Sequence, residues 1–538
     1  MYESFSVGSC TISIHWLFAW SGGGGSARGA LFDFGHGMCG KLYFGAVNQN
    51  TWLNMKMHFV LAGLILLSAC RKHNAGNGGN GGKADTVARY FKDIIIQETL
   101  EGGGFAPFQE ALGYFQLKSD SITQIMVASR GTQELNSAIG FRIASINKTN
   151  GFVNWVKSYD LPDSNYIQLV TCAAIDNNDN IWIGGHSFAG TGVAGILFLA
   201  KLDTAGNMLW SGSFSNYQGW RAYSLTALQN GDVALFAKGF GGFVVLRLTA
   251  SEQLVWSTIV NNVTGGIDND FYADGNNSLS PENHAMVETA DGSIYVASSA
   301  NTRSYAPSTD RLYKLDASGN LQFAKIYTPS FAATIGPVQL VSAGANNLLL
   351  ADQINEQNAF YAPFFNLVSL SGDVQNCRGY ATSTNGGVSG LAINEVNFYR
   401  NSIYYSSCGF YRFDTYVLDL NLNLQSSEET IADNDIGTDR GGISLYDPAE
   451  NALFYLCNFG GNYGQSNGFE VTRNDPVGTP CINTYVDGPF PLTLQDIQMT
   501  ATSDTAIQSV MAGPAPVFTT LGWRSYTVLA TTTVVCGP

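Results

Sequence analysis

The densest group of oxygen-bearing side chains in this chain lies in the run DNDFYADGNN, residues 268–277. Asp268, Asp270 and Asp274 place three carboxylates at short spacing, and Gly275 permits a sharp turn beside them. Calcium prefers hard oxygen ligands of this kind. The EF-hand register does not fit, because Tyr272 stands where an oxygen ligand is needed. We therefore weigh a calcium site against a plain solvated turn, and we expect no other cofactor.

Spacing does not define a catalytic centre elsewhere in the chain. Only His73, His186 and His284 follow residue 70, and the cysteines do not have the paired spacing of a zinc site. Glycoside cleavage needs two opposed carboxylates, and the sequence does not pair any. We expect a non-catalytic protein. The alternative is a hydrolase or lyase acting on polysaccharide with the acidic run at 268–274.

Residues 55–70, MKMHFVLAGLILLSAC, combine a basic start with an apolar run from Phe59 to Leu67. The run is shorter than the roughly 20 apolar residues that span a bilayer, so it is typical of a signal-peptide core. Its end, Leu67 to Cys70, resembles the lipobox of bacterial lipoproteins. That resemblance implies a lipid-modified Cys70 and a protein anchored in the cell envelope. Arg71 in place of Asp implies the outer membrane, on its periplasmic or its external side.

The composition favours an all-β protein without a nucleic-acid partner. Sixty Gly, 12% aromatic residues and only 13% charged residues are typical of β-rich chains. The formal net charge of −15 argues against binding to nucleic acid, because phosphate backbones attract basic surfaces. The partners we expect are the membrane, through the lipid anchor, and a glycan or protein ligand.

One stretch, GILFLAKLDTAGNMLWSGSF at residues 195–214, recurs along the sequence. Relatives begin at Phe141, Phe243 and Arg311, and each consists of two strand-like segments around a turn. The separation of eight positions from Leu202 to Trp210 is repeated in two of these copies, from Leu248 to Trp256 and from Leu315 to Phe323. We interpret the recurring aromatic residues as packing residues between repeats rather than as ligand contacts: Trp155, Trp210, Trp256 and Phe323.

A small residue closes one apolar strand in each repeat. These residues are Ala128, Gly184, Ala237, Ala297, Ala351, Ser406, Cys457 and Ala512. Regular units of four short strands are typical of a β-propeller, and the chain resembles the repeat propellers of Bacteroidetes-type surface lipoproteins. We predict an all-β propeller of about eight four-stranded blades. Seven blades plus a small C-terminal β module from about Asp487 is the alternative.

The domain organisation follows from these features. Residues 1–54 are interpreted as an unstructured upstream mis-start, residues 55–69 as the signal peptide, and residues 70–89 as the lipidated cysteine with a flexible Gly/Asn tether. Residues 90–538 form the predicted propeller. Within it, Asp93 to Gln97 is a strand-like run before the first repeat, and we predict that it closes the ring by joining the last blade.

Six cysteines follow residue 70, which suits an oxidising compartment, although spacing alone does not define their connectivity. Cys408 and Cys457 end equivalent strands of neighbouring repeats, and Cys481 with Cys536 would tie the seventh repeat to the end of the chain. These two pairs are the disulfides we consider. Small buried residues are the alternative, and the favoured one for Cys172.

Propeller topology gathers the loops between blades, and those between second and third strands, on one face. In this chain these loops are rich in aromatic and arginine residues, which suit sugar stacking or a protein partner. The predicted ligand-binding residues are Tyr166, Tyr217, Trp220, Arg221, Tyr272, Arg303, Tyr305, Tyr361, Tyr411 and Arg412. We therefore expect a lipid-anchored binding protein, with a scaffold in an envelope assembly as a further alternative.

Overall fold

The computed structural model divides the chain into two compact units, Met1–Asp85 and Thr86–Pro538. It describes the backbone of three strands between residues 2 and 34, and then the strands and most turns from residue 90 to residue 536. The longer stretches outside the described residues are 35–89, 98–110, 131–139, 263–284, 301–308, 383–392, 432–441 and 475–491. No helix in the described residues is long and apolar enough to cross a bilayer.

In the first unit, β1 (Tyr2–Val7), β2 (Cys10–Ala19) and β3 (Ala27–Phe34) form an antiparallel sheet in that order. This differs from our expectation of an unstructured segment over residues 1–54. The alternation of Ile12, Ile14, Trp16 and Phe18 along β2 has the period of two that a strand requires. The predicted signal peptide, Cys70 and the tether lie outside the described residues.

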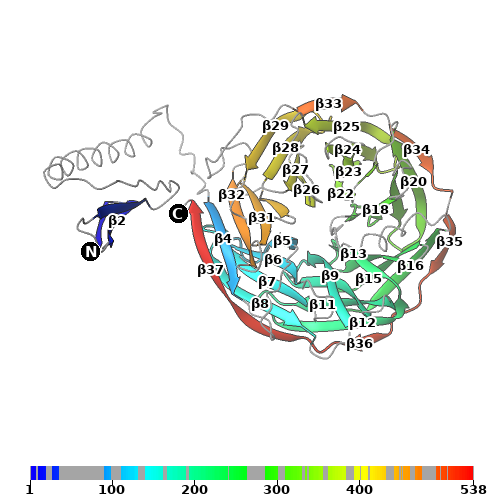
Figure 1. Cartoon of the computed structure of the whole chain (residues 1–538). Helices are drawn as coiled ribbons and strands as arrows, with labels where there is room; N and C mark the ends of the chain where they lie inside the picture. Colours follow the sequence, from blue (N-terminus) through cyan, green and yellow to red (C-terminus); the bar gives the residue numbers. More distant parts are fainter. Residues whose placement is uncertain are drawn as a thin grey trace. The chain divides into compact units, whose positions relative to one another are not determined.

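The second unit is a ring of antiparallel sheets (Figure 1). The described strands form seven four-stranded blades, each consisting of consecutive strands except the last. The first blade consists of β5 (Ala111–Gln116), β6 (Thr123–Arg130), β7 (Gly140–Asn147) and β8 (Val153–Asp160); the second of β9 (Tyr166–Ile175), β10 (Ile181–Ala189), β11 (Val193–Leu202) and β12 (Met208–Gln218); and the third of β13 (Arg221–Ala227), β14 (Val233–Gly239), β15 (Gly242–Leu248) and β16 (Leu254–Asn262). The fourth blade consists of β17 (Met286–Glu288), β18 (Ile294–Ala300), β19 (Thr309–Leu315) and β20 (Leu321–Pro329), and the fifth of β22 (Gln339–Ser342), β23 (Asn347–Asn355), β24 (Ala362–Ser369) and β25 (Val374–Thr382). The sixth blade consists of β26 (Ile393–Tyr399), β27 (Ser402–Gly409), β28 (Arg412–Asp419) and β29 (Leu424–Ile431), and the seventh of β30 (Gly442–Asp447), β31 (Ala452–Gly460), β32 (Asn467–Asn474) and β4 (Tyr90–Gln97). The short β21 (Thr334–Ile335) also pairs with β23.

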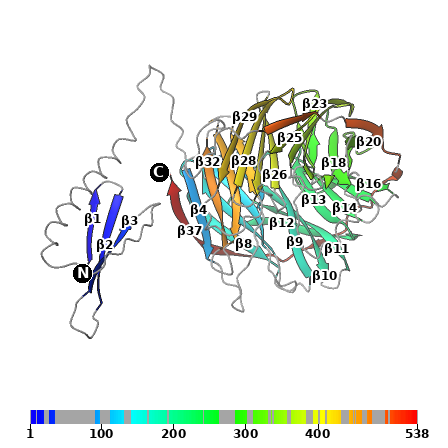
Figure 2. The ribbon, with the colours of Figure 1, turned by 45° about the horizontal axis from the view of Figure 1, so that its top comes forward.

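The first strands of the blades surround the axis and close the ring. Each one contacts the next, from β5 through β9, β13, β17, β22, β26 and β30 and back to β5. The tilted view shows the blades standing side by side around this centre (Figure 2). Seven of the eight predicted small residues lie in the second strands of the seven blades. The eighth, Ala512, lies in an outer strand instead.

The predicted closing strand is present. Residues Asp93 to Gln97 belong to β4, which pairs with β32 as the outermost strand of the seventh blade. The last blade therefore consists of three strands from the end of the repeat region and one from its beginning. This arrangement ties the two ends of the ring together through backbone hydrogen bonds.

The C-terminal strands form a belt around the outside of the ring rather than an eighth blade or a separate module (Figure 1). We call β33 to β37 the belt: β33 (Leu492–Asp496), β34 (Met499–Ser503), β35 (Ile507–Ala512), β36 (Phe518–Thr520) and β37 (Arg524–Cys536). They pair in turn with β25, β20, β16, β12 and β8, and β37 also pairs with β4. The propeller fold is thus confirmed, with the predicted eighth unit distributed over the blade rims.

The hydrophobic core is a series of layers between neighbouring blades. The layer between the second and third blades contains Trp182, Leu199, Leu235 and Leu246, and equivalent layers are described at five other blade boundaries. The sheets of the first five blades therefore bury both faces, which agrees with their mostly apolar strands. All of these layers lie within Thr86–Pro538, so this unit has the cores that it needs to fold on its own.

The recurring turn and aromatic residue pack against each other across blade boundaries. Gly319, in the turn between β19 and β20, has φ of +84°, and a Cβ there would lie 2.7 Å from the indole of Trp256 in the preceding blade. Gly206 lies in the same way against Trp155, with φ of +71° and a Cβ distance of 3.0 Å. The predicted packing role of these aromatic residues is confirmed.

Candidate ligand-binding face

The predicted binding face is described mainly where the second blade continues into the third. Trp220 and Arg221 lie at the connection from β12 to β13, as the propeller topology predicts. Tyr166 begins β9 and Arg412 begins β28 on the same face, although their side chains lie outside the described part. Five predicted residues lie outside the described residues altogether: Tyr272, Arg303, Tyr305, Tyr361 and Tyr411.

Trp220 and Arg221 are both half-buried at this connection. The indole of Trp220 lies against Gly239 at the end of β14, where a Cβ would be 2.6 Å from the ring atom Cε3. Only a residue without a side chain lets the indole approach the strand so closely. The sequence therefore fixes the orientation of Trp220 through a glycine in the neighbouring strand.

Two basic residues lie side by side at the ends of these strands. Arg221 in β13 is the register partner of Lys238 in β14. The ammonium group of Lys238 is buried and lies 4.2 Å from the ring centroid of Tyr223, a cation–π distance. The ring of Tyr223 thus helps to hold the charge of Lys238 close to the predicted binding face, on the strand next to Arg221.

A buried histidine of the second blade lies near Arg221. His186, in β10, is 1% exposed. Burial, with a further contribution from the charge of Arg221, lowers the pKa of its imidazole to about 3. The imidazole ring is therefore neutral at physiological pH, and the positive charge of this pair is on Arg221.

Tyr217 has a different role from the one we predicted. Its side chain is 1% exposed, and its hydroxyl donates a hydrogen bond of 2.6 Å to the carbonyl of Pro514 in the belt. The ring also packs edge-on against Phe214 at 6.3 Å, and burial raises the pKa of the hydroxyl. Tyr217 belongs to the packing between blade and belt, so the described part of the predicted binding face consists of its neighbours.

Sequence reasoning missed Lys238 and His186. Both lie in second strands, close behind the small residues Ala237 and Gly184. The position after the small residue is occupied by Ser, Gly or Asn in five of the seven blades, whereas the third blade has Lys238. A charged residue at such a repeat position is a signal that could have been used. The approach of His186 to Arg221 depends on packing between blades and has no sequence signal.

The calcium and disulfide predictions stay predictions. Asp268, Asp270 and Asp274 lie outside the described residues, and among those described no group of His, Cys, Asp or Glu is placed to hold a metal ion. Cys408 and Cys457 occupy equivalent strands, β27 and β31, as expected. Their side chains and that of Cys536 lie outside the described part, as does Cys481 altogether.

Two other cysteines are described, and both are buried free thiols. Cys172 fills the space left by the missing side chain of Gly184, where a Cβ would be 2.6 Å from its sulfur. Cys377 lies in β25, and burial raises the pKa of its thiol. The favoured interpretation of Cys172 as a small buried residue is confirmed.

No protein-family model matches the chain, and no curated protein matches its sequence. Among solved structures, a protein of unknown function from Dyadobacter fermentans is similar at 9% identity and a TM-score of 0.40, over 72% of this chain and 100% of that one. The polysaccharide lyase Uly1 has 12% identity and a TM-score of 0.39, over 73% and 98%. An alpha-L-arabinanase of Penicillium chrysogenum, in complex with arabinobiose, has 10% identity and a TM-score of 0.39, over 72% and 98%.

Proposed function

We propose that this protein is a lipid-anchored propeller of the cell envelope that binds a glycan or protein ligand at its loop-rich face, without catalysis. The observation that supports it is the half-buried Trp220 beside Arg221 and Lys238. An indole face stacks on the apolar face of a sugar ring, and a guanidinium forms paired hydrogen bonds with a carboxylate. Among ligands, this chemistry favours a glycan that carries carboxylate groups.

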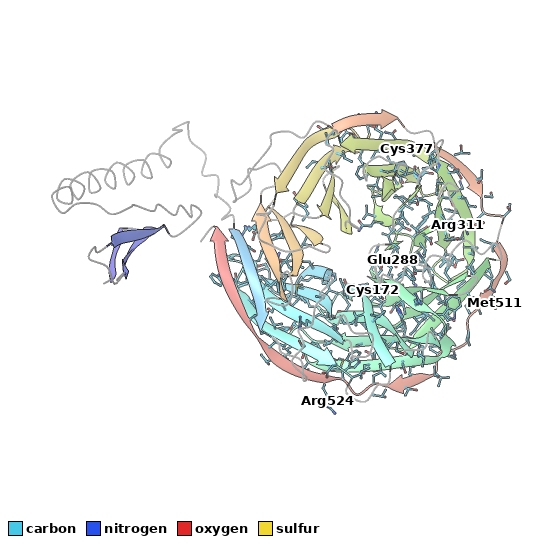
Figure 3. The ribbon with its side chains drawn as sticks, in the orientation of Figure 1. Cys172, Glu288, Arg311, Cys377, Met511 and Arg524 are labelled. Carbon is cyan, nitrogen blue, oxygen red and sulfur yellow. The ribbon has the colours of Figure 1, made fainter. Side chains whose placement is uncertain are left out.

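Calorimetric titration with neutral and uronate-containing oligosaccharides tests the binding proposal. We expect one class of uronate-containing oligosaccharide to bind. Trp220→Ala and Arg221→Ala should each weaken its binding about tenfold or more, because each removes a direct contact. Arg524→Ala is the matched control, because it removes an exposed arginine from the outer rim and should leave affinity unchanged (Figure 3). Equal losses in all three variants would contradict the proposed site.

The same mixtures, followed for hours, separate a binder from an enzyme. Shortened or unsaturated products would favour the alternative of a polysaccharide hydrolase or lyase. Absence of binding to every glycan, together with capture of an envelope protein that depends on Arg221, would favour a protein ligand. If Arg221→Ala changes neither glycan binding nor capture of an envelope protein, the result favours a scaffold role.

The lipid anchor is part of the proposal and is supported by the lipobox-like end at Cys70. Metabolic labelling with a fatty acid in a bacterial host tests it. We expect label in the native chain and none in Cys70→Ser. Label retained by the Cys70→Ser variant would refute lipidation at this residue.

A further inference from the structure

Exposed apolar side chains are concentrated in one part of the ring. Among the described residues, the large hydrophobic side chains that are well exposed lie in the first three blades and in the belt that covers the second and third. We call six of them the apolar sector: Leu209, Val255, Val510, Met511, Val517 and Phe518, which are 37–59% exposed. No large hydrophobic residue described in the fourth or fifth blade is as exposed.

The repeat provides an internal comparison for two of these residues. Leu209 and Val255 precede the recurring aromatic residue in the last strand of the second and third blades. The equivalent positions in other blades carry exposed polar residues: Asn154, Gln322, Gln375 and Gln425. The fold therefore tolerates a polar side chain here, and two neighbouring blades have an aliphatic one instead.

The exposed side chains of the belt change from polar to apolar over the same two blades. Over the fourth blade it presents Thr500, Thr502 and Ser503 to solvent. Over the third and second blades it presents Val510, Met511, Val517 and Phe518, and no charged residue occurs from Thr505 to Trp523. Figure 3 shows Met511 on the outer rim of the ring. Two chain segments that are distant in sequence thus contribute exposed apolar side chains to the outer strands of the same two blades.

This part of the belt is held firmly to the ring. The side chain of Asn216 donates to the carbonyl of Ala515 at 2.6 Å and accepts from the amide of Val517 at 3.1 Å. The amide of Gly513 donates to the carbonyl of Ser257 at 2.9 Å. Phe518 packs against Trp210 and Phe214 with ring centroids 5.5 and 5.1 Å apart. The exposed side chains are therefore presented by an ordered backbone, which lowers the entropic cost of docking.

We propose that the apolar sector rests on a lipid surface, so that the propeller lies with the rim of its second and third blades against the bilayer. The six residues of the sector are all apolar and uncharged, and none of them is Trp, Tyr or Arg, the residues that dominate protein–protein hot spots. The belt strands β35 and β36, which carry Val510, Met511 and Phe518, lie on the outside of the ring, where a flat bilayer can meet them (Figure 1). Apolar side chains at such a surface gain free energy by leaving water.

The length of chain before the ring is compatible with this contact. The ring begins at Tyr90, and the 20 residues from Cys70 to Arg89 span at most roughly 65 Å when extended. A compact unit of this size has a diameter of roughly 60 Å. A lipid on Cys70 therefore leaves every part of the rim within reach of the bilayer. The inference depends on the proposed anchor only for this proximity.

Flotation of residues 86–538 with uncharged phosphatidylcholine vesicles tests the contact without any lipid anchor or signal peptide. We expect weak but measurable partition, reduced about tenfold in Val510→Glu and in Met511→Glu. The matched control is Thr500→Glu, which places the same charge on the belt over the fourth blade and should partition like the parent. Thermal melts of each variant check that the ring is intact.

Equal partition of all four proteins, or no partition of the parent, would overturn the proposal. Self-association of the parent in sedimentation velocity without vesicles, abolished by Met511→Glu, would also overturn it in favour of a second copy of the chain. Oligosaccharide titration of the same variants distinguishes the lipid contact from the proposed glycan site. The Glu variants should bind oligosaccharide like the parent, because the apolar sector is not part of that site. Failure of lipidation at Cys70 would likewise leave the vesicle result unchanged.

Discussion

The recurring glycine and aromatic residue form one structural unit that spans two blades. Gly372 lies against Phe323 as Gly319 lies against Trp256, and Gly372 has a positive φ of +79°. The hydroxyl of Tyr327 then donates to the carbonyl of Gly372 at 2.8 Å. The repeated residues therefore make the contacts between blades, because the turn of one blade packs on the last strand of the blade before it.

Substitution of Gly319 by alanine tests this packing. We expect Gly319→Ala to lower the free energy of unfolding by about 2 to 4 kcal/mol, since it adds backbone strain and a contact of 2.7 Å with the Trp256 indole. Gly231→Ala is the control, because φ there is +91° and no atom lies within 4 Å of the added Cβ. Its cost should be about 1 kcal/mol, from strain alone. Equal losses in urea unfolding would show that the Trp256 contact contributes nothing.

At the scale of elements, the belt protects strand edges that a ring of blades leaves open. The last strand of a blade has unpaired backbone groups along its outer side, and such edges promote aggregation. The belt pairs with these edges in the blades that it passes, and β37 pairs with both β8 and β4 at the junction of the ring ends. The ring is therefore closed twice, once by β4 and once by the belt.

One buried carboxylate fastens the belt between the third and fourth blades. Asp504 follows β34 directly, and its carboxylate lies 3.4 Å from the guanidinium of Arg311 and accepts a 3.4 Å hydrogen bond from Tyr313. Its side chain is fully buried, and that of Arg311 is 8% exposed. Removal of one partner of such a pair leaves the other charge buried without compensation.

We expect Asp504→Asn to lower the free energy of unfolding by about 3 to 5 kcal/mol and to speed hydrogen exchange in β34 and β35 first. Asp291→Asn is the matched control. Its carboxylate lies 3.7 Å from the ammonium of Lys314 but is 57% exposed, so its loss should cost less than about 1 kcal/mol. Unchanged exchange in β34 and β35 would contradict the role of Asp504 as the fastening residue.

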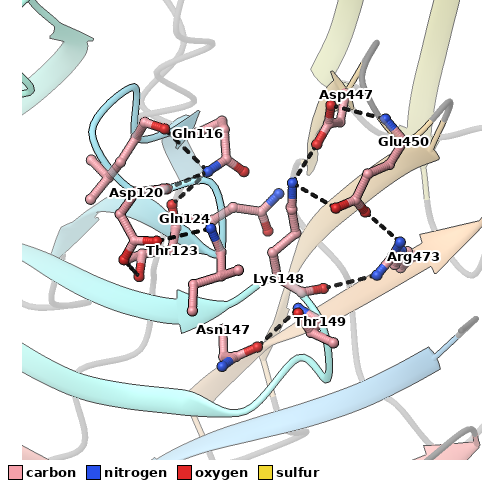
Figure 4. Close-up of polar contacts among 12 residues, drawn as sticks. Gln116, Asp120, Thr123, Gln124, Asn147, Lys148, Thr149, Asp447, Glu450 and Arg473 are labelled. Atoms are coloured by element: carbon pink, nitrogen blue, oxygen red, sulfur yellow. Dashed lines mark hydrogen bonds and ion pairs between the residues drawn. The ribbon is translucent and has the colours of Figure 1, made fainter. Parts of the chain in front are cut away.

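At the scale of the whole molecule, charged side chains join the first and last blades (Figure 4). Lys148, from the turn after β7, lies 2.6 Å from Asp447 and 2.9 Å from Glu450 of the seventh blade. Arg473 in β32 contacts Glu450 as well, and the hydroxyl of Tyr90 donates to the carbonyl of Lys148 at 3.0 Å. The Lys148 side chain is 3% exposed. These contacts form at the seam where the chain returns to its beginning.

Loss of the Lys148 charge should weaken the whole ring. We expect Lys148→Met to lower the free energy of unfolding by about 3 to 5 kcal/mol, because Asp447 would remain a buried carboxylate without its cation. Lys157→Met is the control, since that ammonium donates to the turn carbonyl of Ala205 at 2.8 Å at an exposed blade junction. It should cost about 1 kcal/mol or less. Differential scanning calorimetry should show one transition at a lower temperature, and a separate early transition would contradict a ring that unfolds as a unit.

The sequence by itself determined the local architecture of this protein. Alternating apolar residues, turn residues and their fixed spacing predicted hairpins, four-stranded units and a β-propeller, because these patterns depend on neighbours along the chain. The N-terminal run at Asp93 was predicted as a closing strand because it had no partner of its own. Trp220 and Arg221 were predicted on the binding face because topology alone places the loop between two blades.

Only the tertiary structure decided which edge each C-terminal strand pairs with. The belt strands have the same short apolar pattern as blade strands, and that pattern specifies a strand but not its partner. Ala512 thus fitted the eighth repeat position in sequence while β35 pairs with β16. For the same reason the sequence did not reveal the approach of His186 to Arg221 or the burial of Tyr217. Those relations arise from contacts between sheets and from the belt, which join residues far apart in the chain and leave no local periodicity.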